Sequence, residues 1–206
     1  MESALTALLA AACGYLAGSI PFGLVITRAA GLGDIRKVGS GNIGATNVLR
    51  TGRKDLALAT LLLDSLKAGL VAFAFTYFVN REIGCLAGAS AFLGHCYPIW
   101  LGFRGGKGVA TFAGLLPFVS MPAFLVAAPI WLGVFALSRI SSLAALSAAT
   151  CVTPGAWLAG ERDPLILAGL SLLTLLVFWT HRANLVRLIK GTEPRFGAGK
   201  TDEKGT

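Results

Sequence analysis

The stretch VATFAGLLPFVSMPAFLVAAPIWLGVFALS, residues 109–138, carries no charged side chain over 30 positions. A single straight α-helix of this length would be about 45 Å long, whereas the hydrocarbon core of a bilayer is about 30 Å thick. Pro117 and Pro122 flank a break in the stretch, because proline disrupts the hydrogen bonds of a helix interior. The stretch therefore predicts two consecutive membrane-spanning helices, at roughly 108–118 and 121–138.

Further apolar runs have the length of about 17–25 residues that a membrane-spanning helix requires. These runs are Leu5–Thr27, Leu56–Val79, Ile83–Leu101, Ser141–Ala159 and Pro164–Thr180. The chain of 206 residues is 55% hydrophobic and 14% charged, with a mean hydropathy of +0.72, whereas soluble domains carry about 25% charged residues. None of the runs alternates as a barrel strand does. We therefore expect an all-α, polytopic membrane helix bundle with seven transmembrane helices.

The distribution of basic residues indicates how these helices are oriented. Cytoplasmic loops of membrane proteins are enriched in Lys and Arg. If the loops 28–54, 102–107 and 139–140 and the segment after 180 are cytoplasmic, they hold 15 of the 18 Lys and Arg residues. This arrangement places the N-terminus outside and the C-terminus inside. Because the first run lacks a basic flank and a good cleavage site, we expect a retained helix rather than a signal peptide.

We expect one integral membrane domain over residues 1–191 and a short cytoplasmic tail over 192–206. The loop 28–54 is long, polar and rich in glycine, which is typical of a functional loop. The cysteines are dispersed in or beside apolar runs, as Cys13, Cys85, Cys96 and Cys151. This placement favours packing roles, so we predict no structural disulfide, and neither histidine has the spacing of a metal ligand.

The first candidate site is the segment Gly39-Ser40-Gly41-Asn42-Ile43-Gly44-Ala45-Thr46-Asn47-Val48-Leu49-Arg50. Its glycines allow tight turns in which backbone N–H groups converge on an anion. Ser40, Asn42, Thr46 and Asn47 add neutral donors. Arg50 offers a planar fork for phosphate and, in a helix, shares a face with Thr46. The alternative is a flexible solvated loop, but this density of small donors favours an anion site.

The second candidate site runs from Gly94-His95-Cys96-Tyr97-Pro98 into Gly105-Gly106-Lys107-Gly108. It is not a Walker A loop, because Leu101 and Gly108 stand where that motif requires glycine and Ser or Thr. Its glycine amides, the start of the next helix and the Lys107 ammonium would still converge on one anion. In the alternative interpretation, Arg104 and Lys107 only set the topology or contact lipid headgroups.

Two further pairs of polar residues accompany these segments. His181 and Asn184 end the last span and share a face if the helix continues, although a histidine there can also be an interface anchor. Asp64 and Lys67 lie inside the second span, where each would cost about 2.5–3.5 kcal/mol if it faced lipid. Their i,i+3 spacing allows them to form an ion pair. This pair either takes part in the site or supports it structurally. Together, the two glycine-rich segments and the His181/Asn184 helix end indicate phosphorylated substrates at one membrane face.

The motifs resemble those of the bacterial acyl-phosphate:glycerol-3-phosphate acyltransferases, the PlsY family. The resemblance covers nearly the whole chain, through GSIPFG at 18–23, SGNIGATNVLR at 40–50, GHCYP at 94–98 with GGKGVAT at 105–111, and HRAN at 181–184 with GTEPR at 191–195. It implies a seven-helix, multi-pass enzyme of the bacterial inner (plasma) membrane with its active site facing the cytoplasm. It also implies the first acylation step of phospholipid synthesis, from acyl phosphate and sn-glycerol-3-phosphate to lysophosphatidic acid and phosphate.

The resemblance further implies roles for individual residues. The implied catalytic residues are Ser40, Lys107, His181 and Asn184. The implied substrate-binding residues are Arg50, Asn42, Thr46, Asn47, Gly105, Gly106 and Ser142. Ser141 leaves the register of Ser142 open. We expect no cofactor, no metal and no nucleic acid. The expected partners are the two substrates and the surrounding membrane lipid, and the sequence indicates no protein partner.

The chemistry of acyl phosphate limits what the protein has to do. Acyl phosphate is a mixed anhydride with a good leaving group, so the remaining tasks are to position two anions and to stabilise an oxyanion. Arg50 and Lys107 supply the required cations. Either His181 or the departing phosphate takes the proton of the glycerol hydroxyl, and the sequence leaves both open. The His-x₄-Asp dyad of another acyltransferase design is absent from the sequence.

Two other classes of protein remain as alternatives. A transporter for an organic anion would explain the basic loops and the pair Asp64 and Lys67, but it predicts internal repeats and broken helices at the midplane. A different lipid-phosphate enzyme, such as a nucleotide-activated alcohol transferase, would require an Asp-rich metal motif. The ten acidic residues of the sequence are scattered and form no such motif.

Overall fold

The computed structural model describes residues 2–197, and over this range the chain forms helices and no β-strand. In chain order the helices are α1 (Glu2–Gly18), α2 (Phe22–Ala29), η1 (Ile35–Lys37), α3 (Ala45–Leu49), α4 (Lys54–Phe78), α5 (Arg81–Cys96), η2 (Ile99–Leu101), α6 (Val109–Val119), α7 (Met121–Ser138), α8 (Ser141–Leu158), α9 (Pro164–Thr180) and α10 (Arg182–Ile189). The predicted all-α fold is confirmed. The end of the predicted tail, 198–206, lies outside the described residues.

The predicted break inside the uncharged stretch 109–138 is present, and it lies at Ser120. α6 ends one residue before Ser120 and α7 begins one residue after it. Ser120 has an extended backbone with φ −153° and ψ 98°. Pro122 lies in the first turn of α7, where its missing N–H costs no hydrogen bond. Pro117 lies inside α6, so the separating residue is Ser120 rather than either proline.

Two predicted spans are shortened by prolines. The residue before a proline is disfavoured in helical conformation. α1 ends before Pro21, so the predicted run Leu5–Thr27 is divided between α1 and α2. α5 ends before Pro98 and does not continue to the predicted boundary at Leu101. An average of hydropathy does not detect these breaks, because the flanking residues are apolar.

The helices differ in their capacity to cross a membrane. Within residues 2–197, three segments are long and apolar enough to cross alone, namely Ser3–Ala29, α4 and α7. α9 qualifies only when it is combined with α10, which is bent from it by 63°. α6 has 11 residues, about 16 Å, which is half of the hydrocarbon thickness. Length and hydropathy therefore give three or four candidate spans, between which the shorter helices pack.

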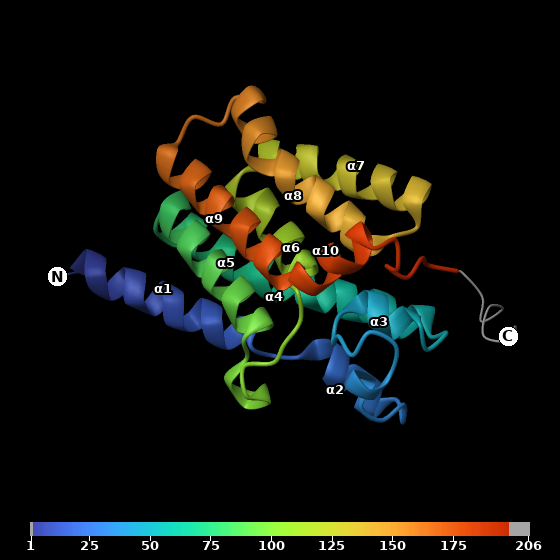
Figure 1. Cartoon of the computed structure of the whole chain (residues 1–206). Coiled ribbons are helices and arrows are strands. Elements are labelled where there is room, and N and C mark those ends of the chain that lie inside the picture. The colour runs from blue at the N-terminus through green and yellow to red at the C-terminus, as the bar shows by residue number, and fades with distance from the viewer. Residues whose placement is uncertain (1, 198–206) are drawn as a thin grey trace, which may run out of the picture.

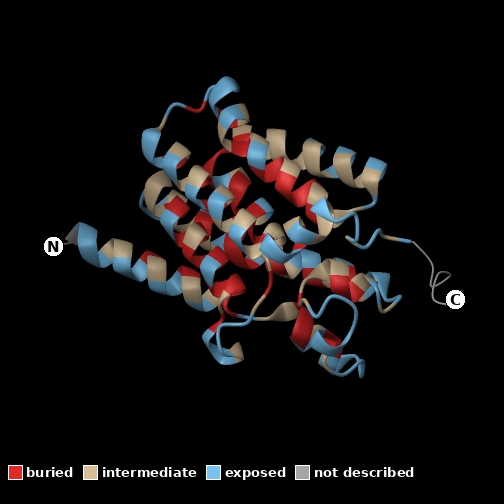
Figure 2. Ribbon diagram, viewed as in Figure 1, coloured by how far each residue is buried: buried red, intermediate tan, exposed pale blue. Residues whose placement is uncertain are grey.

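The core lies where α4, α5, α6, α8 and α9 pack together, as the buried residues in Figure 2 show. α1 packs along α5 through Gly14 and Gly18, where an added Cβ would overlap backbone carbonyls of α5. Such small residues allow close helix packing in a membrane, where apolar burial gives little driving force. α7 buries only Ala123 and leaves leucines such as Leu132 exposed on the outside of the bundle.

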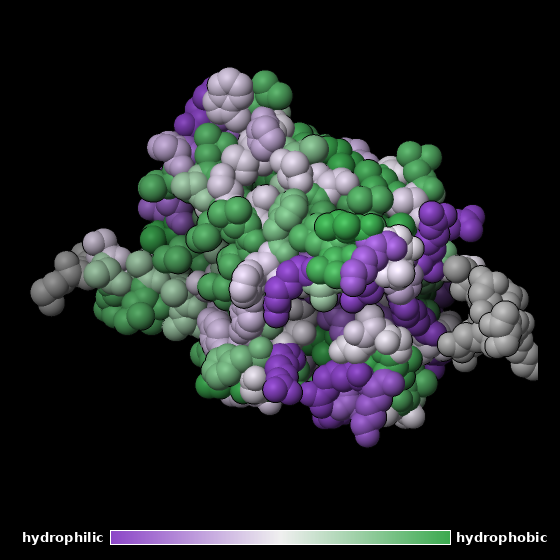
Figure 3. Space-filling model, in the orientation of Figure 1, coloured by the Kyte–Doolittle hydropathy of each residue, from purple (hydrophilic) through white to green (hydrophobic). Residues whose placement is uncertain are grey.

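The polar surface is concentrated at the two ends of the bundle. Figure 1 shows α2, α3 and α10 gathered at one end, while the α8–α9 connection lies at the other. In Figure 3, hydrophilic side chains cluster over the α2, α3 and α10 end, and hydrophobic side chains cover the middle. This distribution is the one expected when lipid surrounds the middle of a helix bundle.

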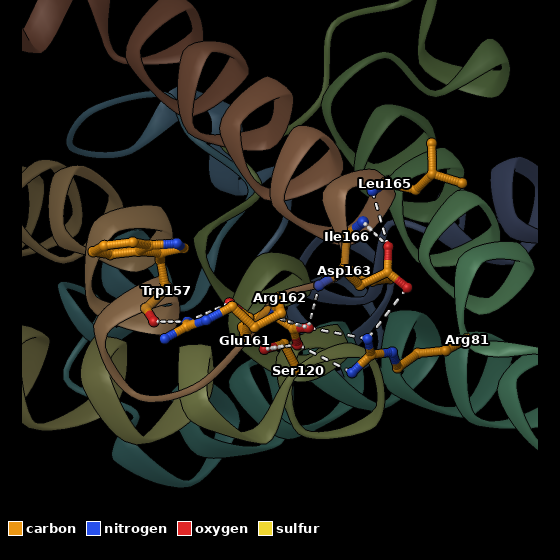
Figure 4. A network of polar contacts seen from close by, with 8 residues as sticks. All are labelled: Arg81, Ser120, Trp157, Glu161, Arg162, Asp163, Leu165 and Ile166. Carbon is orange, nitrogen blue, oxygen red and sulfur yellow. Dashed lines mark hydrogen bonds and ion pairs between the residues drawn. The ribbon is translucent and has the colours of Figure 1, made fainter.

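The end opposite α10 is fixed by an ion-pair network around Glu161 (Figure 4). Arg81, at the start of α5, donates to both carboxylate oxygens of Glu161 at 3.0 Å and to Asp163 at 3.3 Å. The hydroxyl of Ser120 donates to Oε2 of Glu161 at 2.9 Å. Burial would raise the pKa of Glu161, but these bonds outweigh it and hold the pKa below its usual value. The network ties three inter-helix connections together.

We predict that Glu161→Ala lowers the stability of the bundle without a direct effect on the opposite end. Removing one partner of a fully buried ion pair costs about 3–5 kcal/mol, but the Arg81 side chain is 40% exposed, so we expect about 1–3 kcal/mol. Thermal unfolding in detergent micelles measures this change. Asp55→Ala, which breaks the exposed pair with Arg53, is the matched control and is expected to leave the midpoint nearly unchanged. An equal midpoint for both variants would contradict the prediction.

Candidate active site

A cavity of about 660 Å³ opens at the α10 end of the bundle. This volume is typical of a small-molecule site. Its wall contains nine of the predicted site residues, namely Ser40, Asn42, Thr46, Asn47, Arg50, Lys107, Ser142, His181 and Asn184. The wall is formed by residues of α3 to α8 and α10 and by loop residues between these helices. The structure therefore brings segments from both halves of the chain to one place.

Asn47 organises the first motif from within. Its Oδ1 accepts a hydrogen bond from the backbone N–H of Ser40 at 3.0 Å. Its Nδ2 donates to the carbonyl oxygens of Ile35, Val38 and Asn42 at 2.8–3.0 Å. Because the amide is buried and these contacts use both of its ends, Asn47 supports the loop rather than offering a free group to a ligand.

This loop conformation presents Ser40 and Arg50 to the cavity. Gly39 and Gly41 adopt φ values of 57° and 72°, which glycine reaches without strain. The hydroxyl of Ser40 lies 3.3 Å from Oδ1 of Asn47, and the side chain is exposed. Arg50 follows α3 directly and forms no ion pair within residues 2–197. Its guanidinium is therefore available to an anion.

Glu193 is a site residue that the sequence motifs do not predict. Its Oε1 accepts hydrogen bonds from Ser142 Oγ at 2.7 Å and from Asn184 Nδ2 at 2.5 Å. Its Oε2 accepts from Arg187 Nε at 2.7 Å. Burial would raise the pKa of Glu193, but these three bonds outweigh it and keep the pKa below its usual value. The sequence does contain a signal for this role, the block GTEPR at 191–195. The predicted domain boundary at 191, however, places Glu193 in the tail.

The two neighbouring serines at the start of α8 have different partners. Ser141 Oγ lies 3.2 Å from the hydroxyl of Thr46, which joins α8 to α3. Ser142 is the more buried of the two and is held by Glu193. Both serines line the cavity. The contact with Glu193 holds Ser142 beside Asn184, and the choice of Ser142 over Ser141 stays a prediction.

The glycine-rich loop before α6 differs from the predicted anion nest. The N–H groups of Gly105 and Gly106 donate at 3.0 Å to backbone carbonyls at the end of α5. Neither glycine lines the cavity. A Cβ added to Gly106 would overlap the ring of His95. The glycines therefore allow the loop to fold tightly onto α5, and this fold sets Lys107 in the cavity wall.

Lys107 forms no ion pair within residues 2–197, although it is half-buried. Burial lowers the pKa of Lys107 to about 8, while Glu193 opposes this effect and the nearby Arg187 and Arg50 add to it. The ammonium is therefore mostly protonated at pH 7. A bound phosphate would stabilise the charged form further. The site thus holds a cation that has no paired carboxylate among the described residues.

His181 has a defined tautomer. Its Nδ1 lies 2.8 Å from the backbone carbonyl oxygen of Val177. A carbonyl oxygen only accepts, so Nδ1 carries the proton and Nε2 carries a lone pair. Burial lowers the pKa of His181 to about 4, which makes the ring neutral at physiological pH. Thr180 donates to the carbonyl oxygen of Lys107 at 3.1 Å and so holds this helix end against the glycine-rich loop.

The cavity lining combines cationic and apolar side chains. The cations Arg50, Lys54, Lys107 and Arg139 line it without ion-pair partners among residues 2–197. Its two carboxylates are neutralised, since Asp64 pairs with Lys67 at 2.8 Å and Glu193 with Arg187. The lining also contains apolar side chains, among them Ala57, Leu58, Leu61, Trp131 and Phe135. This arrangement suits an anionic ligand with an apolar part.

The family model described as glycerol-3-phosphate acyltransferase matches residues 8–191. The chain belongs to the glycerol-3-phosphate acyltransferase family. The glycerol-3-phosphate acyltransferase of Hyphomonas neptunium is 73% identical over 195 residues and aligns with 94% of each chain. That of Maricaulis maris is 60% identical and aligns with 98% of this chain and 93% of its own. The resemblance that the motifs carry is confirmed.

Solved structures of a family member agree with the observed fold. The crystal structure of PlsY (YgiH), an integral membrane glycerol 3-phosphate acyltransferase, in its glycerol 3-phosphate form has a TM-score of 0.87 and 38% identity, covering 93% of this chain and 96% of its own. Its lysophosphatidic acid form has a TM-score of 0.85 and 36% identity, covering 93% and 95%. This glycerol-3-phosphate acyltransferase is thus an integral membrane protein with that helical fold.

We predict that Glu193→Gln destabilises this acyltransferase and lowers its activity. A hydrogen bond to a charged group contributes about 1.5–3 kcal/mol, and the amide can no longer accept from Arg187 and Asn184 as the carboxylate does. Thermal unfolding and initial rates measure the two effects. Arg195→Ala removes an exposed side chain of the same segment and is the control. Wild-type stability and rate in Glu193→Gln would show that the carboxylate does not hold the site.

Proposed function

We propose that this acyltransferase uses acyl phosphate as its acyl donor. It transfers the fatty acyl group to the 1-hydroxyl of sn-glycerol-3-phosphate and releases lysophosphatidic acid and phosphate. The observation that carries the proposal is the cavity, which combines unpaired cations with apolar side chains. Two phosphate groups require cations, and a fatty chain requires an apolar surface. The glycerol 3-phosphate and lysophosphatidic acid forms of the PlsY structure match the proposed substrate and product.

The enzyme is proposed to lie in the bacterial inner membrane with seven spans, formed by α1 and α4 to α9. The N-terminus is then outside, and the cavity and C-terminus face the cytoplasm. The basic residues around the cavity support this orientation, because cytoplasmic loops are enriched in Lys and Arg. Residues 1–191 form the membrane domain and 192–206 the tail, whose Glu193 returns to the site.

The proposed site residues fall into two groups. The catalytic residues are Ser40, Lys107, His181 and Asn184, and the substrate-binding residues include Arg50, Asn42, Thr46 and Ser142. Arg50 and Lys107 hold the two phosphates, since both lack a carboxylate partner within residues 2–197. Asn47, Gly105 and Gly106 act by shaping the loops, because their amides are used within the protein.

The reaction forms one carbon–oxygen bond and breaks another. The 1-hydroxyl oxygen of glycerol-3-phosphate bonds to the acyl carbon, and the bond from that carbon to the phosphate oxygen breaks, so that phosphate leaves with the electron pair. A cation beside the departing phosphate stabilises this charge. Lys107 is the proposed cation, because it reaches the cavity from the start of α6. The two bound anions are brought together without any covalent intermediate.

The hydroxyl proton is proposed to pass to the departing phosphate. His181 accepts a hydrogen bond from the hydroxyl at Nε2, since its Nδ1 is occupied by Val177. Its pKa of about 4 makes it a poor final base, whereas the oxygen of the departing inorganic phosphate gains negative charge as the bond breaks and becomes a much stronger base. His181 therefore orients the hydroxyl. Asn184 Oδ1 has no hydrogen-bond partner within the described residues and can accept from the second glycerol hydroxyl.

Substitution of the unpaired cations tests this scheme. We expect Arg50→Ala and Lys107→Ala to lower kcat/KM by about 100-fold or more, because each leaves a phosphate without its charge-assisted contact. Phosphate release and lysophosphatidic acid formation from acyl phosphate, without added metal, are the measurements. Lys190→Ala removes an exposed charge that does not line the cavity and is the control. Unchanged kcat/KM in either cavity variant would remove that residue from the scheme.

The pKa of Lys107 predicts the alkaline limb of the pH profile. Because that pKa is lowered to about 8, the ammonium is present below pH 8 and is lost as the pH rises above it. We expect kcat/KM to fall about tenfold per pH unit above this point. Lys107→Arg keeps its charge and should move the limb to higher pH, whatever its absolute rate. A flat profile from pH 7 to 10 in the wild type would contradict the assignment.

A further inference from the structure

Lys67 is the centre of a buried polar cluster beneath the cavity. Its Nζ lies 2.8 Å from Asp64 Oδ1, 2.7 Å from the carbonyl oxygen of Ile20 and 3.0 Å from His95 Nδ1. The side chains of Asp64, Lys67 and His95 are 2%, 3% and 4% exposed. An ammonium group has three protons and accepts no hydrogen bond. Lys67 donates hydrogen bonds to the carbonyl oxygen of Ile20 and to His95 Nδ1, and its charge pairs with Asp64.

This contact defines the tautomer of His95. A neutral imidazole that accepts at Nδ1 carries its proton on Nε2. A doubly protonated ring would place a second positive charge 3.0 Å from the Lys67 ammonium. Within the described residues, the only carboxylate near the ring is Asp64, whose Oδ1 lies 3.5 Å from His95 Nδ1 but only 2.8 Å from Lys67 Nζ. Asp64 is therefore paired with Lys67 rather than with the ring. The geometry therefore favours a neutral ring with a proton at Nε2.

The ring of His95 lies between Lys67, which contacts its Nδ1, and the glycine-rich loop. His95 lines the cavity together with Lys107. Its Nε2 lies against Gly106, where an added Cβ would overlap it. Within residues 2–197, no hydrogen-bond acceptor is paired with this Nε2. An N–H group of a cavity-lining residue that has no protein acceptor can donate to a ligand or to water.

We propose that His95 donates an Nε2–H hydrogen bond to a phosphate oxygen of a substrate in the cavity, with Asp64 and Lys67 fixing its tautomer. The proposal rests on the proposed function insofar as the cavity binds a substrate phosphate. It gives a role to the ion pair of Asp64 and Lys67 within α4, where an unpaired charge would be expensive. His95 would then act as a donor, whereas His181, whose Nδ1 is occupied, acts as an acceptor.

The two tautomers can be observed directly, because the sequence contains only two histidines. The enzyme is labelled with ¹⁵N-histidine, purified in detergent with a tag that contains no histidine, and studied by NMR near neutral pH. His95→Gln and His181→Gln assign the signals. We expect a proton on Nε2 of His95 and on Nδ1 of His181. A proton on Nδ1 of His95 overturns the proposal.

Ligand titration of the labelled enzyme tests the proposed contact. Glycerol-3-phosphate and inorganic phosphate are added separately, so that a response identifies which phosphate reaches His95. We expect at least one of them to shift the Nε2 signal of His95, and a response to neither overturns the proposal. These measurements need no turnover. A failure of the acyl-phosphate reaction would therefore leave them interpretable.

Kinetic comparison of two substitutions adds a second test. In His95→Gln the side-chain amide can place a donor near the position of Nε2, whereas His95→Leu fills the space without a donor. We expect His95→Leu to lower kcat/KM by about 10–100-fold, mainly through a higher KM for the contacted substrate, and His95→Gln to recover most of this loss. Thermal unfolding monitors the fold of both variants. Wild-type kcat/KM in folded His95→Leu, or equal losses in both folded variants, overturns the proposal.

Discussion

An unpaired charge inside a bilayer is expensive, and this constraint decides where the charged groups of this acyltransferase lie. In the middle of the bundle, Asp64 and Lys67 neutralise each other. At the end opposite the cavity, Arg81 neutralises Glu161. Four cations without ion-pair partners among residues 2–197 line the cavity, where substrate can reach them, namely Arg50, Lys54, Lys107 and Arg139. The site therefore concentrates positive charge that no paired carboxylate balances.

Loops at such a site require support, because catalytic groups must be held in position before the substrate arrives. Two buried side chains provide much of this support. Asn47 gathers the first loop through its amide, and Glu193 connects α8 to α10 and the following segment. Both residues are satisfied entirely within the protein. They leave the cations beside them free, which separates the groups that build the site from the groups that bind anions.

The apolar runs, the break near Ser120 and the motifs could be predicted from the sequence, because each depends on neighbouring residues alone. The contacts of Glu193 could not, since Ser142 lies 51 positions away and only the packed bundle brings the two together. The role of Gly105 was open for a related reason. Glycine permits either an anion nest or close packing, and the choice follows from the carbonyl groups that α5 presents to the loop.

The division of the first predicted span has a consequence for the site. Pro21 ends α1, and the carbonyl oxygen of Ile20 then lies at a helix end, where intrahelical partners are missing. Lys67 donates to this oxygen while it also contacts Asp64 and His95. The helix break, the intramembrane ion pair and the histidine beneath the glycine-rich loop are therefore parts of one hydrogen-bonded unit. In a continuous first helix, the carbonyl oxygen of Ile20 would accept a hydrogen bond from within the helix. Lys67 would then lose this acceptor.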